Sequence, residues 1–278
     1  MKKNKLLRRL TAALLAAVLT LSIALPVFAS DDGDTIYINS VSDLLSLAKS
    51  CAYDQWSVGK TVILQKDLSL EGMLWEPIPS FSGQFKGNGH TISDLTITGQ
   101  YSPAGLFGIV EEQGSIESLS VRGIVSVSDS ADTTTGGIVG INHGTLINCQ
   151  FTGVVTGDSE VGGIVGRNES EGTIDHSTAR AIVTGKSSTG GIAGYNLGAI
   201  TGCTNVGSIN TEYQEASLDT DGFTAKMVDQ INNKMAAADD DATNSVTNVA
   251  TDTGGIAGRS SGMILTSVNT GTVGYEHM

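Results

Sequence analysis

The sequence predicts an all-β fold, a parallel β-solenoid in which short strands wind into stacked coils. Three observations support this prediction. Glycine accounts for 35 of 278 residues while proline accounts for only four, a balance typical of short strands joined by tight turns. A glycine-rich motif recurs along the chain. Residues at equal positions after each copy share one chemical character, as the stacking of like positions requires.

The recurring motif is Gly-Gly-Ile-Val/Ala-Gly. Four copies occupy residues 136–140, 162–166, 190–194 and 254–258, and a degenerate fifth copy occupies residues 104–108. The steps between successive copies are 32, 26, 28 and 64 residues. A unit of 26 to 28 residues has room for three short strands with turns between them. Because alternation within each strand is brief, stacked three-stranded coils are favoured over isolated hairpins.

In this register, one column of small residues is expected to face the interior. Its members are Leu119, Cys149, Ser177, Cys203 and Ser267. A whole coil separates Cys149 from Cys203, which places them roughly 9 to 10 Å apart at the usual strand spacing. A disulfide needs Cα atoms within about 7 Å of each other. We therefore expect reduced, buried thiols.

A second column holds Asn142, Asn168 and Asn196, and Ser260 interrupts it. Stacked asparagines at a turn can hydrogen-bond to one another along the solenoid axis. We therefore predict a structural amide ladder at these positions rather than a ligand site.

Residues 1–29 have the features of a secretory signal peptide. Five basic residues precede an apolar stretch from Leu10 to Leu25, and small residues before Ser30 provide a cleavage site. The apolar stretch is short and no stop-transfer pattern follows it, so a membrane anchor is less favoured. We expect a protein that is secreted or displayed at the cell surface, with no membrane span in the mature chain.

The chain is acidic. Its formal net charge is −13, and this becomes −18 once the five basic residues of segment 1–29 are removed. Nucleic acids and anionic membranes are negatively charged, so this balance disfavours both as partners.

Residues 35–80 are expected to form an N-terminal cap and the first strands. A helix is predicted over residues 40–56, and either Ser40 or Ser42 can cap its start. A solenoid has to cover its first coil, because open strand edges recruit other chains. We therefore assign the helix to the N-terminal end of the solenoid.

The repeat coils are expected over residues 81–210 and, after an insertion, over residues 251–278. The insertion, residues 211–250, has apolar residues at helical spacing, so a helical insertion is predicted. Its acidic stretch does not match a calcium loop, because Val228 falls where an EF-hand needs a bidentate Glu.

The final coil is expected to expose its strand edges, since no helix or amphipathic segment follows it before Met278. Exposed edges predict self-association through this coil. Two alternatives stay open: a truncated gene product, and a cover supplied by the insertion.

The repeats resemble the GLUG-type repeat of bacterial surface proteins, which include large adhesins and the outer portions of immunoglobulin-A-cleaving metalloproteases. The segment Trp75-Glu76-Pro77-Ile78, with the following FSGQFKGNGHTISDLTI, is similar to the segment that precedes such repeats. The resemblance extends from about residue 35 to residue 275, apart from the insertion. It implies a right-handed parallel β-helix related in shape to pectate lyases, with no settled activity. No His-Glu-x-x-His occurs, so the protease portion is absent.

Asp175 and His176 resemble an Asp-His pair that pectate lyases present on a strand. The repeat register places Asn148 and Gly202 beside this pair, so neighbouring coils offer no further carboxylates for a calcium cluster. The two nearby arginines are interpreted as surface charges. We expect no catalytic residue, no cofactor and no metal site.

The function predicted from the sequence is non-catalytic binding by a secreted or cell-surface β-helix module, in the manner of an adhesin. The ligand is expected to be an extracellular protein or glycan. The candidate binding surface is the exposed column of Ile141, Arg167, Tyr195 and Arg259, since solenoids bind through long, regular faces. Two alternatives stay open: a polysaccharide lyase or glycoside hydrolase of the pectate-lyase-like fold, and a spacer segment of a larger surface protein.

Overall fold

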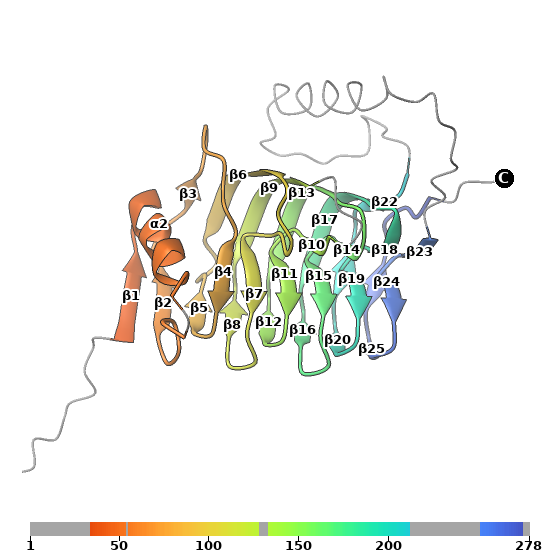
Figure 1. Ribbon diagram of the computed structural model, residues 1–278. Helices are drawn as coiled ribbons and strands as arrows, with labels where there is room; N and C mark the ends of the chain where they lie inside the picture. Colours follow the sequence, from red (N-terminus) through yellow and green to blue (C-terminus); the bar gives the residue numbers. More distant parts are fainter. Residues whose placement is uncertain (1–33, 54, 128–132, 212–250, 275–278) are drawn as a thin grey trace, which may run out of the picture. The chain divides into compact units, whose positions relative to one another are not determined.

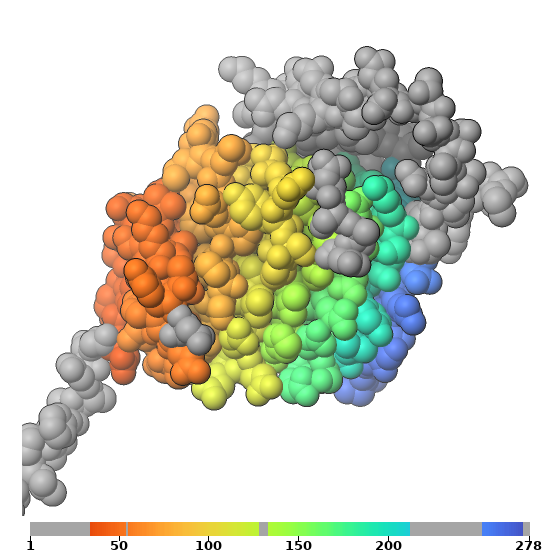
Figure 2. Space-filling view, in the orientation of Figure 1, coloured from red at the N-terminus to blue at the C-terminus, as the bar shows by residue number. Residues whose placement is uncertain are grey.

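The described residues form a right-handed parallel β-solenoid with one short helix (Figure 1). The computed structural model describes residues 34–53, 55–127, 133–211 and 251–274. The signal peptide expected at residues 1–29 and the insertion expected at 211–250, except for residue 211, lie outside the described residues. From Thr35 onward the chain is one compact unit. In the space-filling view its coils follow one another in sequence order, from orange to blue (Figure 2).

The strands form four sheets, in which neighbouring strands pair in parallel. Sheet A contains β1 (Thr35–Ile38), β2 (Thr61–Leu64), β5 (Gln84–Lys86), β8 (Ser115–Glu117), β12 (Thr145–Ile147), β16 (Thr173–Asp175), β20 (Ala199–Thr201) and β25 (Met263–Leu265). Sheet B contains β3 (Leu68–Ser69), β6 (Thr91–Gly99), β9 (Ser120–Val127), β13 (Gln150–Thr156), β17 (Thr178–Thr184), β21 (Thr204–Asn205), β22 (Ser208–Ile209) and β26 (Val268–Asn269). Sheet C contains β4 (Ile78–Phe81), β7 (Phe107–Val110), β11 (Val139–Asn142), β15 (Val165–Asn168), β19 (Ala193–Asn196) and β24 (Ala257–Ser260). Sheet D contains β10 (Thr135–Gly136), β14 (Val161–Gly162), β18 (Ser187–Gly190) and β23 (Thr251–Gly254).

Sheet D corrects the expectation of three strands in each repeat coil. The first glycine of the Gly-Gly motif is itself a strand residue, and Gly136, Gly162, Gly190 and Gly254 pair in register. These strands are as short as two residues. Two residues cannot show an alternation of polar and apolar side chains, so the sequence pattern gave no sign of a fourth strand.

The interior of sheet A is a column of apolar side chains, one from each coil. Its fully buried members are Val62, Phe85, Ile116, Leu146, Ile174 and Ile200. Burying a side chain of this size contributes about 1.5–3 kcal/mol relative to leaving it in water. Because each residue stacks on its counterpart in the next coil, the column holds the coils in register.

The predicted amide ladder is confirmed. The Asn142 Nδ2 donates to the Asn168 Oδ1 at 2.8 Å, and the Asn168 Nδ2 donates to the Asn196 Oδ1 at 2.8 Å. The ladder ends where the Asn196 Nδ2 donates to the Ser260 Oγ at 3.1 Å. The three asparagines are fully buried, so these bonds satisfy polar groups that water cannot reach.

Helix α2 (Val41–Ser50) lies at the end of the solenoid that carries β1 and β2 (Figure 1). Of the two cap residues considered, Ser40 is the N-cap, and its Oγ accepts from the Asp43 N–H at 3.2 Å. The helix is shorter than the predicted 40–56. The Cys51 N–H still donates to the Leu47 carbonyl, but the N–H groups of Ala52 and Tyr53 bond three residues back, so the helical pattern of i to i−4 bonds stops after Cys51. In the described part of the chain, no helix is long and apolar enough to span a bilayer.

Candidate functional site

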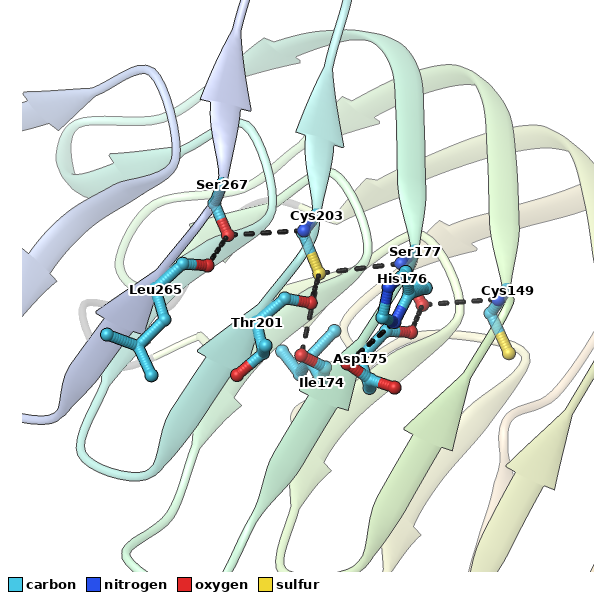
Figure 3. Close-up of polar contacts among 9 residues, drawn as sticks. All are labelled: Cys149, Ile174, Asp175, His176, Ser177, Thr201, Cys203, Leu265 and Ser267. Atoms are coloured by element: carbon cyan, nitrogen blue, oxygen red, sulfur yellow. Dashed lines mark hydrogen bonds and ion pairs between the residues drawn. The ribbon is translucent and has the colours of Figure 1, made fainter.

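The cysteine column lies inside the solenoid as predicted (Figure 3). The Cys149 N–H donates to the Ser177 Oγ at 3.1 Å, and the Ser177 N–H donates to the Cys203 Sγ at 3.4 Å. The Cys203 N–H then donates to the Ser267 Oγ at 3.2 Å. Ser177, Cys203 and Ser267 therefore each accept a hydrogen bond from the preceding coil, a contact that either a Cys or a Ser side chain can make. The cysteines are free thiols.

The buried thiols lead to a prediction about reactivity and pH. Burial raises the pKa of Cys149 from 9.0 to about 12, and burial likewise raises the pKa of Cys51 and of Cys203 to about 11. We expect none of the three to react with a thiol reagent at pH 8 while the chain is folded, and all three to react in denaturant, because the thiolate is the reactive form. Counting modified thiols by mass spectrometry measures this.

The same pKa values predict how stability depends on pH. The folded chain keeps its thiols protonated above pH 9, where the unfolded chain releases those protons. This contribution to stability is therefore complete below pH 9 and is lost as the pH rises toward 11–12. In the labelling experiment, modification of Cys149 at pH 8 while the chain is folded would contradict the placement of this thiol in the interior.

The Asp175–His176 pair belongs to a turn that recurs in the solenoid. The His176 Nδ1 lies 2.8 Å from the Asp175 Oδ1, and the imidazole is mostly exposed (Figure 3). His176 has a backbone φ of +46°, and its counterparts Asn148 and Gly202 have φ of +52° and +62°. The strand partners of Asp175 are Ile147 and Thr201. Among the described residues, no group of three or more His, Cys, Asp or Glu side chains is placed to hold a metal ion.

The four residues proposed for ligand binding form one outward column on sheet C. Ile141 pairs with Arg167, Arg167 pairs with Tyr195, and Tyr195 pairs with Arg259 across β11, β15, β19 and β24. Ile141, Arg167 and Tyr195 are partly buried, whereas Arg259 is exposed. The structure thus brings together residues that are up to 118 positions apart in the chain.

Arg167 is held by two carboxylates. Its Nη1 lies 2.7 Å from the Glu160 Oε1, and its Nε lies 2.7 Å from the Glu169 Oε1. Partial burial acts to lower the pKa of the guanidinium, but the charges of Glu160 and Glu169 outweigh it and keep that pKa above its ordinary value. The positive charge of Arg167 is therefore more than balanced within the protein, because two carboxylates face one guanidinium. Neither Glu160 nor Glu169 was predicted from the sequence as a partner of Arg167, although Glu169 stands only two residues after it.

The Tyr195 ring lies between two guanidinium groups. The Arg167 Cζ is 5.1 Å from the ring centroid, and the Arg259 Cζ is 5.5 Å from it. Both distances are in the range of cation–π attraction. Because the arginines come from the coils on either side, the faces of the ring are covered. The ring is therefore not available to stack on a sugar, whereas the guanidinium edge of Arg259 is exposed and can donate hydrogen bonds.

Comparison with known proteins relates this chain to GLUG-repeat proteins. The family model of the GLUG motif matches residues 157–184, a segment that runs from the turn before β14 to the end of β17 and is one complete coil. The predicted resemblance to GLUG-type repeats is thereby confirmed.

Two curated relatives share part of the sequence. Halomucin of Haloquadratum walsbyi is 32% identical over 155 residues, which are 51% of this chain and 2% of halomucin. A protein of Evansella cellulosilytica, named as a Gly-rich membrane protein, is 29% identical over 137 residues, which are 36% of this chain and 16% of that protein. The chain thus matches only a small part of each relative.

One solved structure has a similar fold. It is a crystal structure of a Bacteroides ovatus protein described as an immunoglobulin A1 protease, with a TM-score of 0.57 and 18% identity. The similarity covers 86% of this chain and 66% of that one. At this identity the comparison supports the β-solenoid fold alone.

Proposed function

We propose that this chain is a non-catalytic binding module of a secreted or cell-surface protein, and that it binds an extracellular macromolecule through the outward column on sheet C. The observation that carries the proposal is the stack of Arg167, Tyr195 and Arg259, which presents a guanidinium edge on a regular β surface. Rigid elements position binding groups more precisely than loops do.

A surface location is supported from two directions. Residues 1–29 have the pattern of a signal peptide. The sequence relatives carry the names halomucin and Gly-rich membrane protein, which suggest proteins outside or at the boundary of the cell. The small share of each relative that is matched fits a module within a longer protein.

The chemistry of the column indicates which ligand groups it binds. Glu160 and Glu169 neutralise Arg167, so the charge available to a ligand on this column comes from Arg259. A guanidinium presents planar N–H donors that match carboxylates, sulfates and peptide carbonyls. Since the faces of Tyr195 are covered, we propose a glycan or protein with carboxylate or carbonyl groups rather than a neutral sugar held by stacking.

We also propose that α2 caps the N-terminal coil. Its side chains Leu44 and Leu47 are buried in the same core cluster as Ile38 of β1. Ser40 and Asp43 fix the start of the helix, so its apolar face is aimed at the end of the solenoid.

Binding assays with defined polysaccharides test the proposed function. Polygalacturonate carries carboxylates and dextran is neutral, and biolayer interferometry can compare the two. In about 150 mM salt, which screens the repulsion from the acidic chain beyond about 8 Å, we expect the chain to bind polygalacturonate through its exposed guanidinium. Arg259→Ala should weaken this binding about 10-fold, the typical loss of one good charged contact. Arg180→Ala is the matched control, because Arg180 is an exposed arginine on sheet B, and we expect it to bind like the unaltered chain.

The same samples distinguish binding from cleavage. Incubation with calcium and polygalacturonate, followed by absorbance of unsaturated products, tests the alternative of a polysaccharide lyase. Product that forms with the unaltered chain and is lost in Asp175→Asn or His176→Ala would contradict a non-catalytic module. Equal weakening by Arg259→Ala and Arg180→Ala would show that binding depends on overall charge rather than on this column.

A further inference from the structure

Among the described residues, the coil that contains β23 to β26 leaves part of the apolar interior exposed. Ile264 of β25 continues the sheet A column, and its counterpart in the preceding coil, Ile200, is fully buried. Ile264 itself is 38% exposed, and its strand neighbours Met263 and Leu265 are 52% and 47% exposed. Strands β23, β24, β25 and β26 each stand at the end of a sheet, and Figure 1 shows this edge opposite α2 and β1. Within the described ranges, no strand pairs with the free side of β25.

The backbone of β25 shows which groups are free to pair. The Met263 N–H donates to the Gly198 carbonyl at 2.8 Å, and the Leu265 carbonyl accepts from the Gly202 N–H at 3.0 Å. Backbone groups of successive residues in a strand point to opposite edges. The N–H and C=O of Ile264 therefore both point away from β20, toward the open end.

Two features indicate a second copy as the occupant of this face. Residues 251–274 carry one acidic and one basic side chain, Asp252 and Arg259, in a chain of net charge −13. A symmetric contact places like charges near each other, so a nearly neutral face is the part of an acidic chain that can meet itself. Head-to-tail stacking would leave sheet C unpaired, because α2 packs against β4, which is the end strand of that sheet.

We propose that β25 pairs with β25 of a second copy in antiparallel orientation centred on Ile264, so that the chain forms a twofold dimer through its last coil. In this arrangement each Ile264 N–H donates to the Ile264 carbonyl of the other copy, which is the hydrogen-bonded pair of an antiparallel ladder. The two Ile264 side chains meet across the axis. The apolar column of one solenoid then continues into that of the other.

Sedimentation equilibrium of residues 30–278 tests the dimer. This form retains the whole compact unit that begins at Thr35. We expect a monomer–dimer equilibrium with a dissociation constant of about 10 μM or tighter. Ile264→Asp should weaken association at least about 100-fold, because two carboxylates would face each other at the axis. Ile264→Pro should weaken it as well, since it removes the outward N–H and leaves the Met263 and Leu265 bonds to β20 in place.

A cross-link tests the geometry directly. In a hydrogen-bonded antiparallel pair the facing Cα atoms lie about 5.5 Å apart, which is within the range for a disulfide. Ile264→Cys should therefore give a disulfide-linked dimer under mild oxidation. Leu74→Cys and Leu74→Asp are the matched controls, because Leu74 is an exposed leucine outside the last coil, and neither should cross-link or dissociate the dimer. Circular dichroism checks that each variant is folded.

Two outcomes overturn the proposal. One is a folded, unaltered chain that remains monomeric at about 100 μM. The other is a dimer that Ile264→Asp leaves intact, since its interface would then lie elsewhere. Neither outcome depends on polysaccharide binding, because Ile264 and Arg259 are changed in separate variants.

Discussion

Gly163→Ala is expected to destabilise the solenoid more than Asn168→Ala or Gly89→Ala. A Cβ built on Gly163 would lie 2.2 Å from the Gly191 carbonyl oxygen and 2.9 Å from the Ala179 Cβ. Gly191 belongs to the next coil, whereas Ala179 belongs to β17 of the same coil and packs beneath the glycine. Gly191 meets the carbonyl oxygen of Gly255 in the same way at 2.3 Å. The coils would have to separate to admit a methyl group. We expect a loss of at least about 4 kcal/mol in the free energy of unfolding, measured by urea denaturation followed by circular dichroism.

Gly89→Ala is the control for this variant. Gly89 has a φ of +78°, and a methyl group added to its Cα would meet nothing within 4 Å, so an alanine there causes backbone strain but no clash. Its expected cost is about 1 kcal/mol. Similar losses for the two variants would contradict the close approach of coils at the Gly-Gly motif.

Asn168→Ala should cause the second largest loss. The Asn168 Oδ1 accepts from the Asn142 Nδ2, and the Asn168 Nδ2 donates to the Asn196 Oδ1 and to the Gly172 carbonyl at 3.1 Å. Truncation removes these three bonds and leaves buried partners on both sides. At about 1 kcal/mol for each bond, with a further cost for unsatisfied groups, we expect a loss of about 3–5 kcal/mol. Urea denaturation measures it.

Asn39→Ala is the matched control for the ladder, because Asn39 is exposed. Its expected effect is within about 0.5 kcal/mol. Asn168→Asp adds a test of the donor. An ionised carboxylate cannot donate to the Asn196 Oδ1, so this variant should gain stability as the pH falls and the carboxyl group becomes protonated. If Asn168→Ala and Asn39→Ala are equally stable, the ladder does not stabilise the solenoid.

The interior columns could be predicted from the sequence because each repeat contributes one residue to the same position. The character of that position is therefore shown by several residues rather than by one. Cys149 alone gives no indication of its surroundings, but Ser177, Cys203 and Ser267 at the same position show that the site is small and faces inward. The asparagine ladder was predicted for the same reason. Because the coils stack, equivalent residues of successive repeats occupy the same kind of environment.

Features that occur once, or that span few residues, were not predictable in this way. The salt bridge from Arg167 to Glu160 joins β15 to the turn before β14, and among the other copies only the last has an acid and an arginine at these positions, with the shorter Asp252 in place of Glu. The strands of sheet D are too short to show a period. The end of α2 depends on turn bonds that begin at Ala52, and the apolar spacing does not encode them. The register of the outward column was predicted correctly. The ion pairs of Arg167 and the contacts of the two arginines with the Tyr195 ring depend on side-chain geometry, which the register does not give.

The polar contacts between β19 and β24 continue across a step of 64 residues, since the Asn196 Nδ2 still reaches the Ser260 Oγ. Strand β22 ends at Ile209 and β23 begins at Thr251, and β23 and β24 pair with β18 and β19 in unbroken register. Lengthening a connection adds little entropy cost once it is already long. The connection between Ile209 and Thr251 is therefore a position where a different sequence can be inserted, in evolution or by design. The strands on both sides would keep their pairing.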